Sequence, residues 1–344
     1  MGVLALGYHN TADTGSRKNT EGLRFSSGIA AARRWLPALR REAELIVVLS
    51  HQGSAVDRVL AHEVPGIDVI VGAHSHDRIA PPERVAGTWL VQALSDGAAL
   101  GALTLQLAPD GRVAAVSGGV QTLWTDTVAE DPSTARLVEQ LRAPHRAKLE
   151  APVAEAVDRI GRNYRSESPF DVLVGDVLRA HAAADVALLP GVGYGVSLEP
   201  GVVTREALHA LLPHPTPLAT LTLTGRQVIE VLEQSATNQR PADPLDRVGG
   251  LVQTSGLRWT VDLQRPVGTR VSGVSLAGAR LTADSRVRVA THEGMLGGLH
   301  RYRCLAEGTD VRVHDVHVID VVETALRQRG RIHAPALGHI TLRQ

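Results

Sequence analysis

The chain has 344 residues, 44% of them hydrophobic and 21% charged, a composition typical of a soluble globular protein. Its 36 basic and 36 acidic side chains cancel, which argues against a nucleic acid or an anionic membrane as a partner. The single cysteine, Cys304, excludes an internal disulfide and a thiolate-rich metal cluster. We expect it to be a small, buried apolar residue.

Targeting signals are not evident in the sequence. The apolar start, residues 1–7, lacks the basic residues and the length of a signal peptide. No stretch reaches the ~20 apolar residues of a membrane span. As written, the chain is expected to be cytoplasmic. A periplasmic or exported protein is expected if a further segment precedes it.

Strands and helices alternate in the first part of the chain. A polar stretch from Asn10 to Gly22 predicts a loop, and Ser54 is expected to cap a helix. Pro109-Asp110-Gly111 predicts a hairpin turn. The expected strands are 3–7, 45–49, 67–71, 88–93, 100–107 and 112–118, and the expected helices are 29–41 and 55–63. This order predicts an α/β layered domain that ends in antiparallel strands.

A second domain follows a charged helical connector that opens at Asp131-Pro132 and reaches Glu150. Its expected helices are 170–182, 204–212, 226–235 and 320–328, and its expected strands are 185–189, 218–223, several between 252 and 289, and 311–319. We therefore predict domains over 1–125 and 151–344, joined by a linker over 126–150.

Three histidines follow two of the apolar strands. His51 comes after strand 45–49, and His74 and His76 come after strand 67–71. Short β-branched runs of this kind are typical of the inner strands of a covered sheet, where ligands bind at the carboxyl ends. Imidazole nitrogens bind Zn, Mn or Fe well, so the pattern predicts a metal site.

The same segments carry a family resemblance. Leu49-Ser-His-Gln-Gly53 and Gly66-Ile-Asp-Val-Ile-Val-Gly-Ala-His-Ser-His-Asp77 resemble the last two metal-binding motifs of the 5′-nucleotidase-type metallophosphoesterases, a superfamily that includes the SoxB thiosulfohydrolases. Gly250-Leu-Val-Gln-Thr-Ser-Gly-Leu-Arg-Trp259 resembles the family's carboxy-terminal domain. Phe170-Asp-Val-Leu-Val-Gly-Asp-Val-Leu-Arg-Ala180 and Arg247-Val-Gly-Gly-Leu251 look closest to the SoxB branch.

The resemblance assigns roles to these residues. It implies a metallophosphoesterase sandwich joined to a 5′-nucleotidase-type α/β domain, with two divalent ions, Mn or Zn, that activate water. His51 and His74 would bind one ion and His76 the other. Asp77 would orient an imidazole from behind, although a surface aspartate is an equally good interpretation.

The family's earlier motifs, Asp-x-His and Gly-Asn-His-Glu/Asp, do not precede His51. The catalytic histidine of the family belongs to one of them, so no residue here is assigned that role. The sequence therefore predicts a truncated sandwich that holds half of the metal site and at most one ion. Unpaired apolar sheet edges are expected to need a partner or a missing segment to cover them.

The substrate pocket is also predicted from the resemblance. Nucleotidases of this family clamp the base between two aromatic rings and hold phosphate with an arginine, but the matching positions here are Gly193 or Tyr194, Leu251 and Gly294. With few aromatic residues present, nucleotide hydrolysis is disfavoured. A small ester or an ester carried on a sulfur-carrier protein is favoured instead.

The leading hypothesis is thus a metal-dependent hydrolase of a phosphate or sulfur ester, with SoxB-like specificity slightly ahead of a nucleotide 5′-phosphatase or cyclic phosphodiesterase. The second hypothesis is a noncatalytic remnant or binding module, in which the histidines are vestigial.

Overall fold

The computed structural model describes residues 1–109, 111–192 and 196–343. The chain divides into two compact units, Met1–Ala135 and Arg136–Gln344, and each is described by itself below. No helix in the described ranges has the length and hydropathy needed to cross a membrane.

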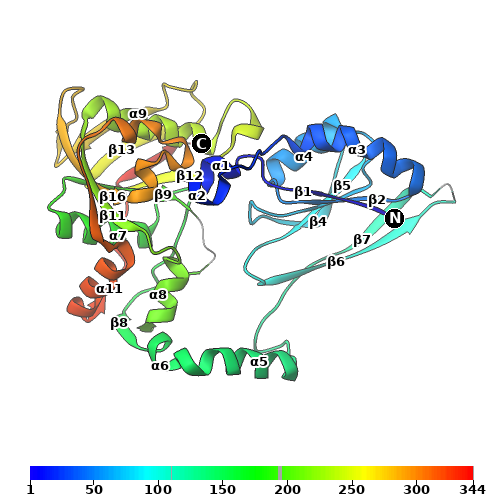
Figure 1. Ribbon diagram of the computed structural model, residues 1–344, viewed down its shortest axis with the longest axis horizontal. Helices are drawn as coiled ribbons and strands as arrows, with labels where there is room; N and C mark the ends of the chain where they lie inside the picture. The colour runs from blue at the N-terminus through cyan, green and yellow to red at the C-terminus, as the bar shows by residue number, and fades with distance from the viewer. Residues whose placement is uncertain (110, 193–195, 344) are drawn as a thin grey trace. The chain divides into compact units, whose positions relative to one another are not determined.

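A five-stranded sheet organises the first unit (Figure 1). Its strands follow the order β1 (Gly2–Leu6), β2 (Ile46–Ser50), β3 (Val69–Gly72), β5 (Thr88–Ala93) and β4 (Arg78–Val85). The first four are parallel and β4 is antiparallel to β5. The predicted buried strands are therefore neighbours, and their carboxyl ends lie at one edge of the sheet.

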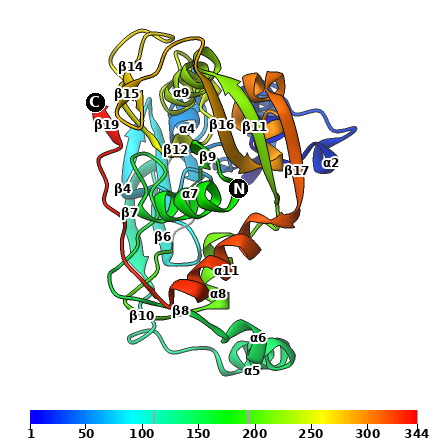
Figure 2. The ribbon, with the colours of Figure 1, turned by 90° about the vertical axis from the view of Figure 1, so that its left-hand side faces the viewer.

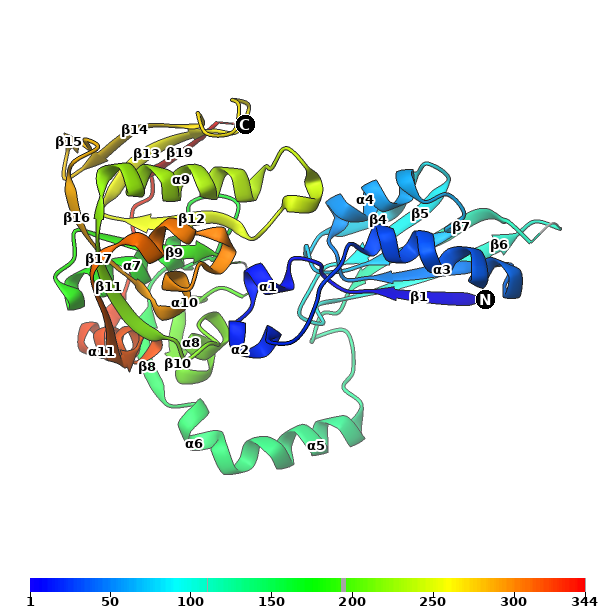
Figure 3. The same ribbon diagram turned by 45° about the horizontal axis from the view of Figure 1, so that its top comes forward.

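Two helices, α3 (Gly28–Glu42) and α4 (Ser54–Glu63), cover one face of this sheet (Figure 3). Burial alternates along the strands because successive side chains point to opposite faces. Gly2 lies against α3, where an added Cβ would approach Leu39 and Ala43. On the opposite face Val3, Leu49 and Val71 are 47%, 47% and 39% exposed, so that face is apolar and open to solvent.

Two expectations for this unit are wrong. The stretch from Asn10 to Gly22 contains two short helices, α1 (Thr11–Thr14) and α2 (Arg17–Thr20), instead of a plain loop. Strand β4 was not expected because it contains Pro81 and Pro82. Strand β4 lies at the sheet edge, and its register with β5 shifts between Ile79 and Glu83. The two prolines, which lack a backbone N–H, fall within this shift and do not interrupt regular strand pairing.

The predicted hairpin is confirmed as a two-stranded antiparallel ribbon of β6 (Ala99–Leu107) and β7 (Val113–Thr122). Next comes α5 (Pro132–Arg142), whose first turn is held by Asp131, since its carboxylate accepts from the backbone N–H groups of Ser133 and Thr134. A short helix, α6 (Arg146–Leu149), completes the charged connector segment.

The second unit is built on a five-stranded mixed sheet (Figure 2). Its order is β12 (Gly250–Ser255), β9 (Val186–Gly191), β16 (Arg286–His292), β11 (Pro217–Thr224) and β17 (Thr309–His317). Helices α7 (Pro169–Ala182) and α11 (Val318–Arg329) pack in one hydrophobic cluster, while α9 (Gly225–Gln239) packs in another. Leu189 and Leu188 point into different clusters, so helices cover both faces of the sheet.

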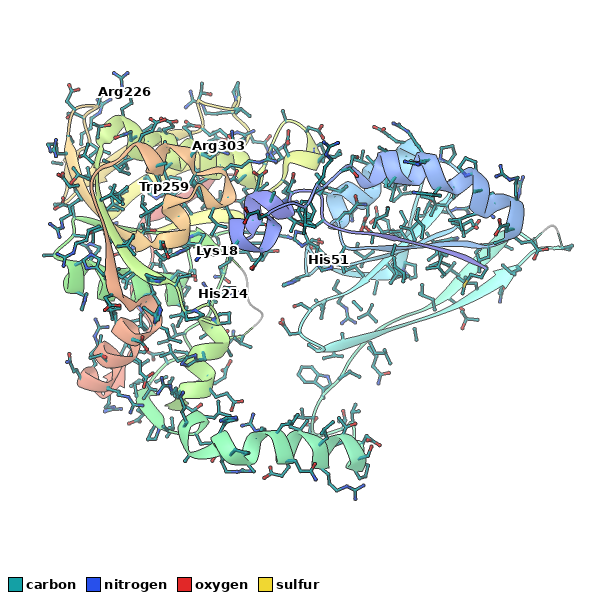
Figure 4. The ribbon with its side chains drawn as sticks, viewed as in Figure 1. Lys18, His51, His214, Arg226, Trp259 and Arg303 are labelled. Atoms are coloured by element: carbon teal, nitrogen blue, oxygen red, sulfur yellow. The ribbon has the colours of Figure 1, made fainter. Side chains whose placement is uncertain are left out.

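Smaller sheets complete this unit. One has the order β15 (Ala279–Arg280), β14 (Val271–Leu276), β13 (Leu257–Asp262) and β19 (Ile340–Arg343). The other joins β10 (Gly201–Thr204), β8 (Pro152–Ala156) and β18 (Arg331–Ile332), next to α8 (Arg205–Leu211). Trp259, labelled in Figure 4, is 2% exposed and donates to Thr254 Oγ1 at 3.0 Å. The predicted mixed α/β class is confirmed in both units.

Two local details agree with the sequence. Thr224 and Gln227 form a capping box at the start of α9, which fixes where the helix begins. Cys304 is 5% exposed, and burial raises the pKa of its thiol to about 12. The expectation of a buried, unreactive cysteine is confirmed.

Candidate functional site

Two of the predicted histidines meet at the carboxyl edge of the first sheet. Ser50 of β2 and Gly72 of β3 are paired in parallel register, so the residues after them leave the sheet side by side. The rings of His51 and His74 are 5.1 Å apart between centroids, edge to face. His51, labelled in Figure 4, is exposed, and its backbone N–H donates to the Leu6 carbonyl at 2.9 Å, which ties it to β1.

The turn after β3 has an unusual backbone. His74 and His76 adopt positive φ values of 75° and 56°, a region that only a few per cent of non-glycine residues enter. Such conformations cost on the order of 1–3 kcal/mol each and persist only where the surroundings hold them. Ser75, between the two histidines, donates its N–H to the Ala73 carbonyl at 3.0 Å.

A hydrogen-bond network holds this turn against α4 and β5. The Ser75 hydroxyl accepts from the backbone N–H of Ser54 at 3.0 Å and lies 3.1 Å from the Gln92 amide. The amide orientation that satisfies all partners directs the Gln92 oxygen to the backbone N–H groups of His76 and Asp77, both at 3.1 Å. Gln92 is 1% exposed, so these bonds are shielded from water.

The expected role of Ser54 as a helix cap is wrong. The residue before α4 that occupies the cap position is Gly53, with φ 93° and no side-chain bond to the helix. Ser54 is the first helical residue, and its hydroxyl donates to Asp77 Oδ2 at 2.6 Å. Asp77 therefore anchors the histidine turn to the start of α4.

The structure adds two aromatic residues that the sequence analysis missed. The Tyr8 ring lies 3.9 Å from the His74 ring, and the Tyr8 and His9 rings are 5.7 Å apart. Both residues follow β1, which pairs in parallel with β2. Their positions directly after β1 place them at the same edge of the sheet as His51.

Burial and charge keep the His74 imidazole neutral. Burial lowers its pKa to about 4, with smaller contributions in the same direction from His51, His76 and His9. At neutral pH the ring is therefore uncharged, and one of its nitrogens has a free lone pair. This is the form in which imidazole binds a metal ion.

A buried carboxyl group lies beneath the site. Asp57 of α4 is 0% exposed, and burial raises its pKa to about 6 despite a hydrogen bond from the Ser50 hydroxyl and the nearby Arg58. Its Oδ2 atom has no hydrogen-bond partner among the described residues. A Cβ at Gly72 would lie 2.7 Å from that atom, so the glycine makes room for the carboxyl.

These donors fit a metal ion only in part. Neutral, closely spaced imidazoles are suitable ligands. However, within the ranges that the structure describes, no group of three or more His, Cys, Asp or Glu side chains is placed to hold an ion. The residues present do not amount to a complete metal site.

The second unit contains the predicted substrate-pocket positions. Gly193 and Tyr194 lie outside the described residues. Leu251 is fully buried in the cluster that packs around α9. Gly294 lies in α10 (Glu293–Leu296), where an added Cβ would be 3.0 Å from the His292 ring, so this imidazole occupies the space that a larger side chain would need.

His292 is the main titratable group at this second location. Burial lowers its pKa to about 4, and its Nδ1 atom has no hydrogen-bond partner among the described residues. His300, a second buried imidazole, has φ 53° and lies against Gly249, where an added Cβ would be 2.1 Å from Nδ1. Neither histidine was predicted from the sequence as a site residue.

Comparison with known proteins supports the family resemblance. Residues 148–307 match the model of the 5′-nucleotidase C-terminal domain. The structure of sulfate thiohydrolase SoxB from Thermus thermophilus superposes with a TM-score of 0.90 at 27% identity, over 99% of this chain and 62% of that one. The second unit thus carries a 5′-nucleotidase C-terminal domain, and the chain as a whole is similar to the 5′-nucleotidase-type metallophosphoesterases. The resemblance noted in the sequence is therefore confirmed.

Other relatives agree. The uncharacterized metallophosphoesterase YunD of Bacillus subtilis is 29% identical over 209 residues, 58% of this chain and 44% of YunD. Apyrase of Aedes aegypti is 28% identical over 312 residues, 80% of this chain and 52% of the apyrase. A 5′-nucleotidase precursor from Thermus thermophilus shares the fold with a TM-score of 0.87 at 23% identity, over 99% of this chain and 72% of that one. The chain thus spans about half the length of YunD and about half the length of the apyrase.

Proposed function

We propose that this protein is a metal-dependent ester hydrolase in which His51 and His74 are two of the ligands of a divalent ion, Mn or Zn, and His76 lies on the same turn. The observation that carries the proposal is the pairing of His51 and His74, with ring centroids 5.1 Å apart, at the carboxyl edge of a parallel sheet. Similarity to metallophosphoesterases and to the 5′-nucleotidase C-terminal domain supports the same chemistry.

The chain's own groups prepare this pair. The depressed pKa of His74 keeps its imidazole neutral, and the Tyr8 ring at 3.9 Å limits how far the imidazole can turn. Gln92 and Ser75 hold the backbone of the turn by hydrogen bonds, and this fixes the backbone positions from which the His74 and His76 side chains extend. A divalent ion bound there would supply Lewis acidity toward an ester oxygen and water.

For the substrate we propose a phosphate or sulfur ester without a nucleobase, as in SoxB-like specificity. Base stacking needs a planar aromatic face. The two clamp positions inferred from the family are instead a core leucine, Leu251, and a glycine, Gly294, whose side-chain space is taken by His292. A small ester, or one attached to a sulfur-carrier protein, makes no demand for such a clamp.

A second candidate function is a noncatalytic binding module. It is favoured by one observation, that no group of three or more metal-ligating side chains is assembled in the described ranges. In that case the histidine turn would be a retained structural feature, and the carboxy-terminal unit would carry the function.

Hydrolysis assays distinguish the two. The full chain is assayed with Mn²⁺ or Zn²⁺ on a cysteine S-sulfonate peptide, a phosphomonoester and a nucleoside monophosphate. The proposal expects metal-dependent turnover of an ester without a base, lost in His74→Ala and retained in His62→Ala, an exposed histidine of α4. No turnover of any ester with either metal would favour the binding module, and turnover of the nucleotide alone would overturn the substrate assignment.

A further inference from the structure

A small cavity in the second unit contains charged groups that the proposed hydrolysis does not use. Its volume is about 190 Å³, and it is bordered by α7, by the link between β12 and β13, and by the turn after β14. It opens at the Ser255 end of β12, whereas Leu251 is near the other end of that strand. The charged side chains that line it are Asp176, Arg179, Arg258 and His339.

Arg179 is held rigidly in this cavity. Its Nε donates to the Asp185 carbonyl at 3.0 Å and its Nη1 to Ser255 Oγ at 3.2 Å. Gly256 has φ 91°, and a Cβ there would lie 2.8 Å from Arg179 Nε, so only glycine lets the guanidinium lie against the backbone. The Ser255 hydroxyl, 3% exposed, donates in turn to Asp176.

Arg258 is a second guanidinium, and it has spare hydrogen-bond donors. Its Nη1 donates to the Gly338 carbonyl at 3.1 Å. Within the part of the chain that the structure describes, it forms no ion pair with a carboxylate, whereas Arg179 is 3.5 Å from Asp176. A guanidinium has five N–H donors in a planar fork suited to oxyanions, so most of those on Arg258 remain for a ligand.

His339 contributes an oriented imidazole. Its Nδ1 lies 2.9 Å from Glu167 Oε1, and that carboxylate also accepts from the backbone N–H groups of Gly338 and His339 at 2.6 and 3.0 Å. Glu167 is 8% exposed, so the arrangement is well fixed. A carboxylate on Nδ1 fixes the orientation of the ring.

We propose that this cavity binds a small tetrahedral oxyanion, such as phosphate or sulfate. Two guanidiniums against one carboxylate give the lining a net positive charge even when His339 is neutral. The volume far exceeds the roughly 10–15 Å³ that one water needs, yet it is below the roughly 300 Å³ at which pockets for larger organic ligands begin. Size therefore excludes a nucleotide and admits a single oxyanion.

Calorimetric titration of the full chain with sodium phosphate and with sodium sulfate, at constant ionic strength, tests this. The wild type is expected to bind one anion per chain. Arg258→Ala is expected to weaken binding at least ten-fold, and Arg258→Lys, which keeps the charge without the fork, by less. The matched control is Arg286→Ala, which removes an exposed arginine of β16 that pairs with Asp310 at 3.1 Å.

Two further readouts keep the result specific. The amide resonances of Gly256 and Gly278, which both line the cavity, should shift on phosphate addition in the wild type but not in Arg258→Ala. His339→Gln, which removes the imidazole held by Glu167, should also weaken phosphate binding relative to the wild type. Absence of saturable binding to the wild type, or equal losses in Arg258→Ala and Arg286→Ala, would overturn the assignment.

Discussion

His51 and His74 face one another across two adjacent parallel strands, with their rings 5.1 Å apart and at 61°. The pairing of Ser50 with Gly72 brings them together, and the turn after β3, with two histidines at positive φ, directs them. A single-residue slip between β2 and β3 would send the side chains of one strand to the opposite face, so this contact depends on the register of the sheet.

The half-buried imidazole of His74 should make stability fall with acidification. In the metal-free chain its pKa is about 4, whereas an unfolded histidine titrates near 6.5, so the unfolded state binds more protons between these values. Stability contributed by the neutral ring is therefore present above about pH 6.5 and is lost as the pH falls toward 4.

Urea unfolding midpoints across this range test the prediction. His74→Gln should flatten the loss on acidification, while His62→Gln, on the exposed side of α4, should leave the wild-type slope unchanged. Identical slopes for the wild type and His74→Gln would show that the imidazole is not buried as described.

Asp57 should act with the opposite sign. Burial raises its pKa from 3.8 to about 6, so the folded state binds more protons than the unfolded state in this window. As the pH rises from below 3.8 to above 6, ionisation of the buried carboxyl should lower the free energy of unfolding by about 3 kcal/mol. The figure follows from ~1.4 kcal/mol for each unit of difference between the folded and unfolded pKa. Asp57→Asn, which stays neutral, should lack that loss.

The measurement is the difference in unfolding free energy between Asp57→Asn and the wild type, at a pH below 4 and again at neutral pH. We expect the difference to shift in favour of the variant at the higher pH. Asp68→Asn is a comparison variant, since Asp68 is paired with Arg40. A constant difference at both pH values would rule out a buried ionisable group at position 57.

How much of this site the sequence predicts depends on which interactions set it. The β-branched runs before His51 and His74 predict buried parallel strands, and strand-end geometry then places the histidines together. Tyr8 and His9 were missed because strand ends were considered only for the two runs before His51 and His74, although both residues follow β1, which pairs with β2.

Elsewhere tertiary contacts overrode local signals. Ser54 has the residue type and position of a helix cap, but its hydroxyl donates a hydrogen bond to Asp77, 23 residues further along the chain. Gly53 occupies the N-cap position instead. Pro81 and Pro82 argue against a strand on their own, yet a register shift at the sheet edge accommodates both in β4.

The second unit should be sensitive to one glycine. A Cβ at Gly250 would lie 2.0 Å from the Tyr164 carbonyl oxygen, a backbone atom that cannot simply move aside. Gly250→Ala should therefore destabilise the unit by about 1–3 kcal/mol, the usual cost of overpacking. Gly161→Ala, whose Cβ would meet only Ser197 Oγ at 3.8 Å, should change stability by less than about 0.5 kcal/mol in thermal unfolding. Equal effects would contradict the close approach.

The buried ion pair between Arg162 and Asp171 should matter more than an exposed one. Their side chains are 4% and 1% exposed, and the pair distance is 3.0 Å. Asp171→Ala leaves a buried guanidinium without its carboxylate and should cost about 3–5 kcal/mol in urea unfolding. Asp310→Ala, which removes the exposed pair with Arg286, should cost about 1 kcal/mol or less. Similar losses in both variants would refute this ranking.

Zinc titration of the chelator-treated full chain, followed by calorimetry, measures whether the histidine pair binds a metal ion. We expect no more than one ion per chain, with affinity lost in the double variant His51→Ala/His74→Ala and kept in His62→Ala. Absence of zinc binding by the wild type, or binding that survives the double variant unchanged, would contradict a metal role for this histidine pair.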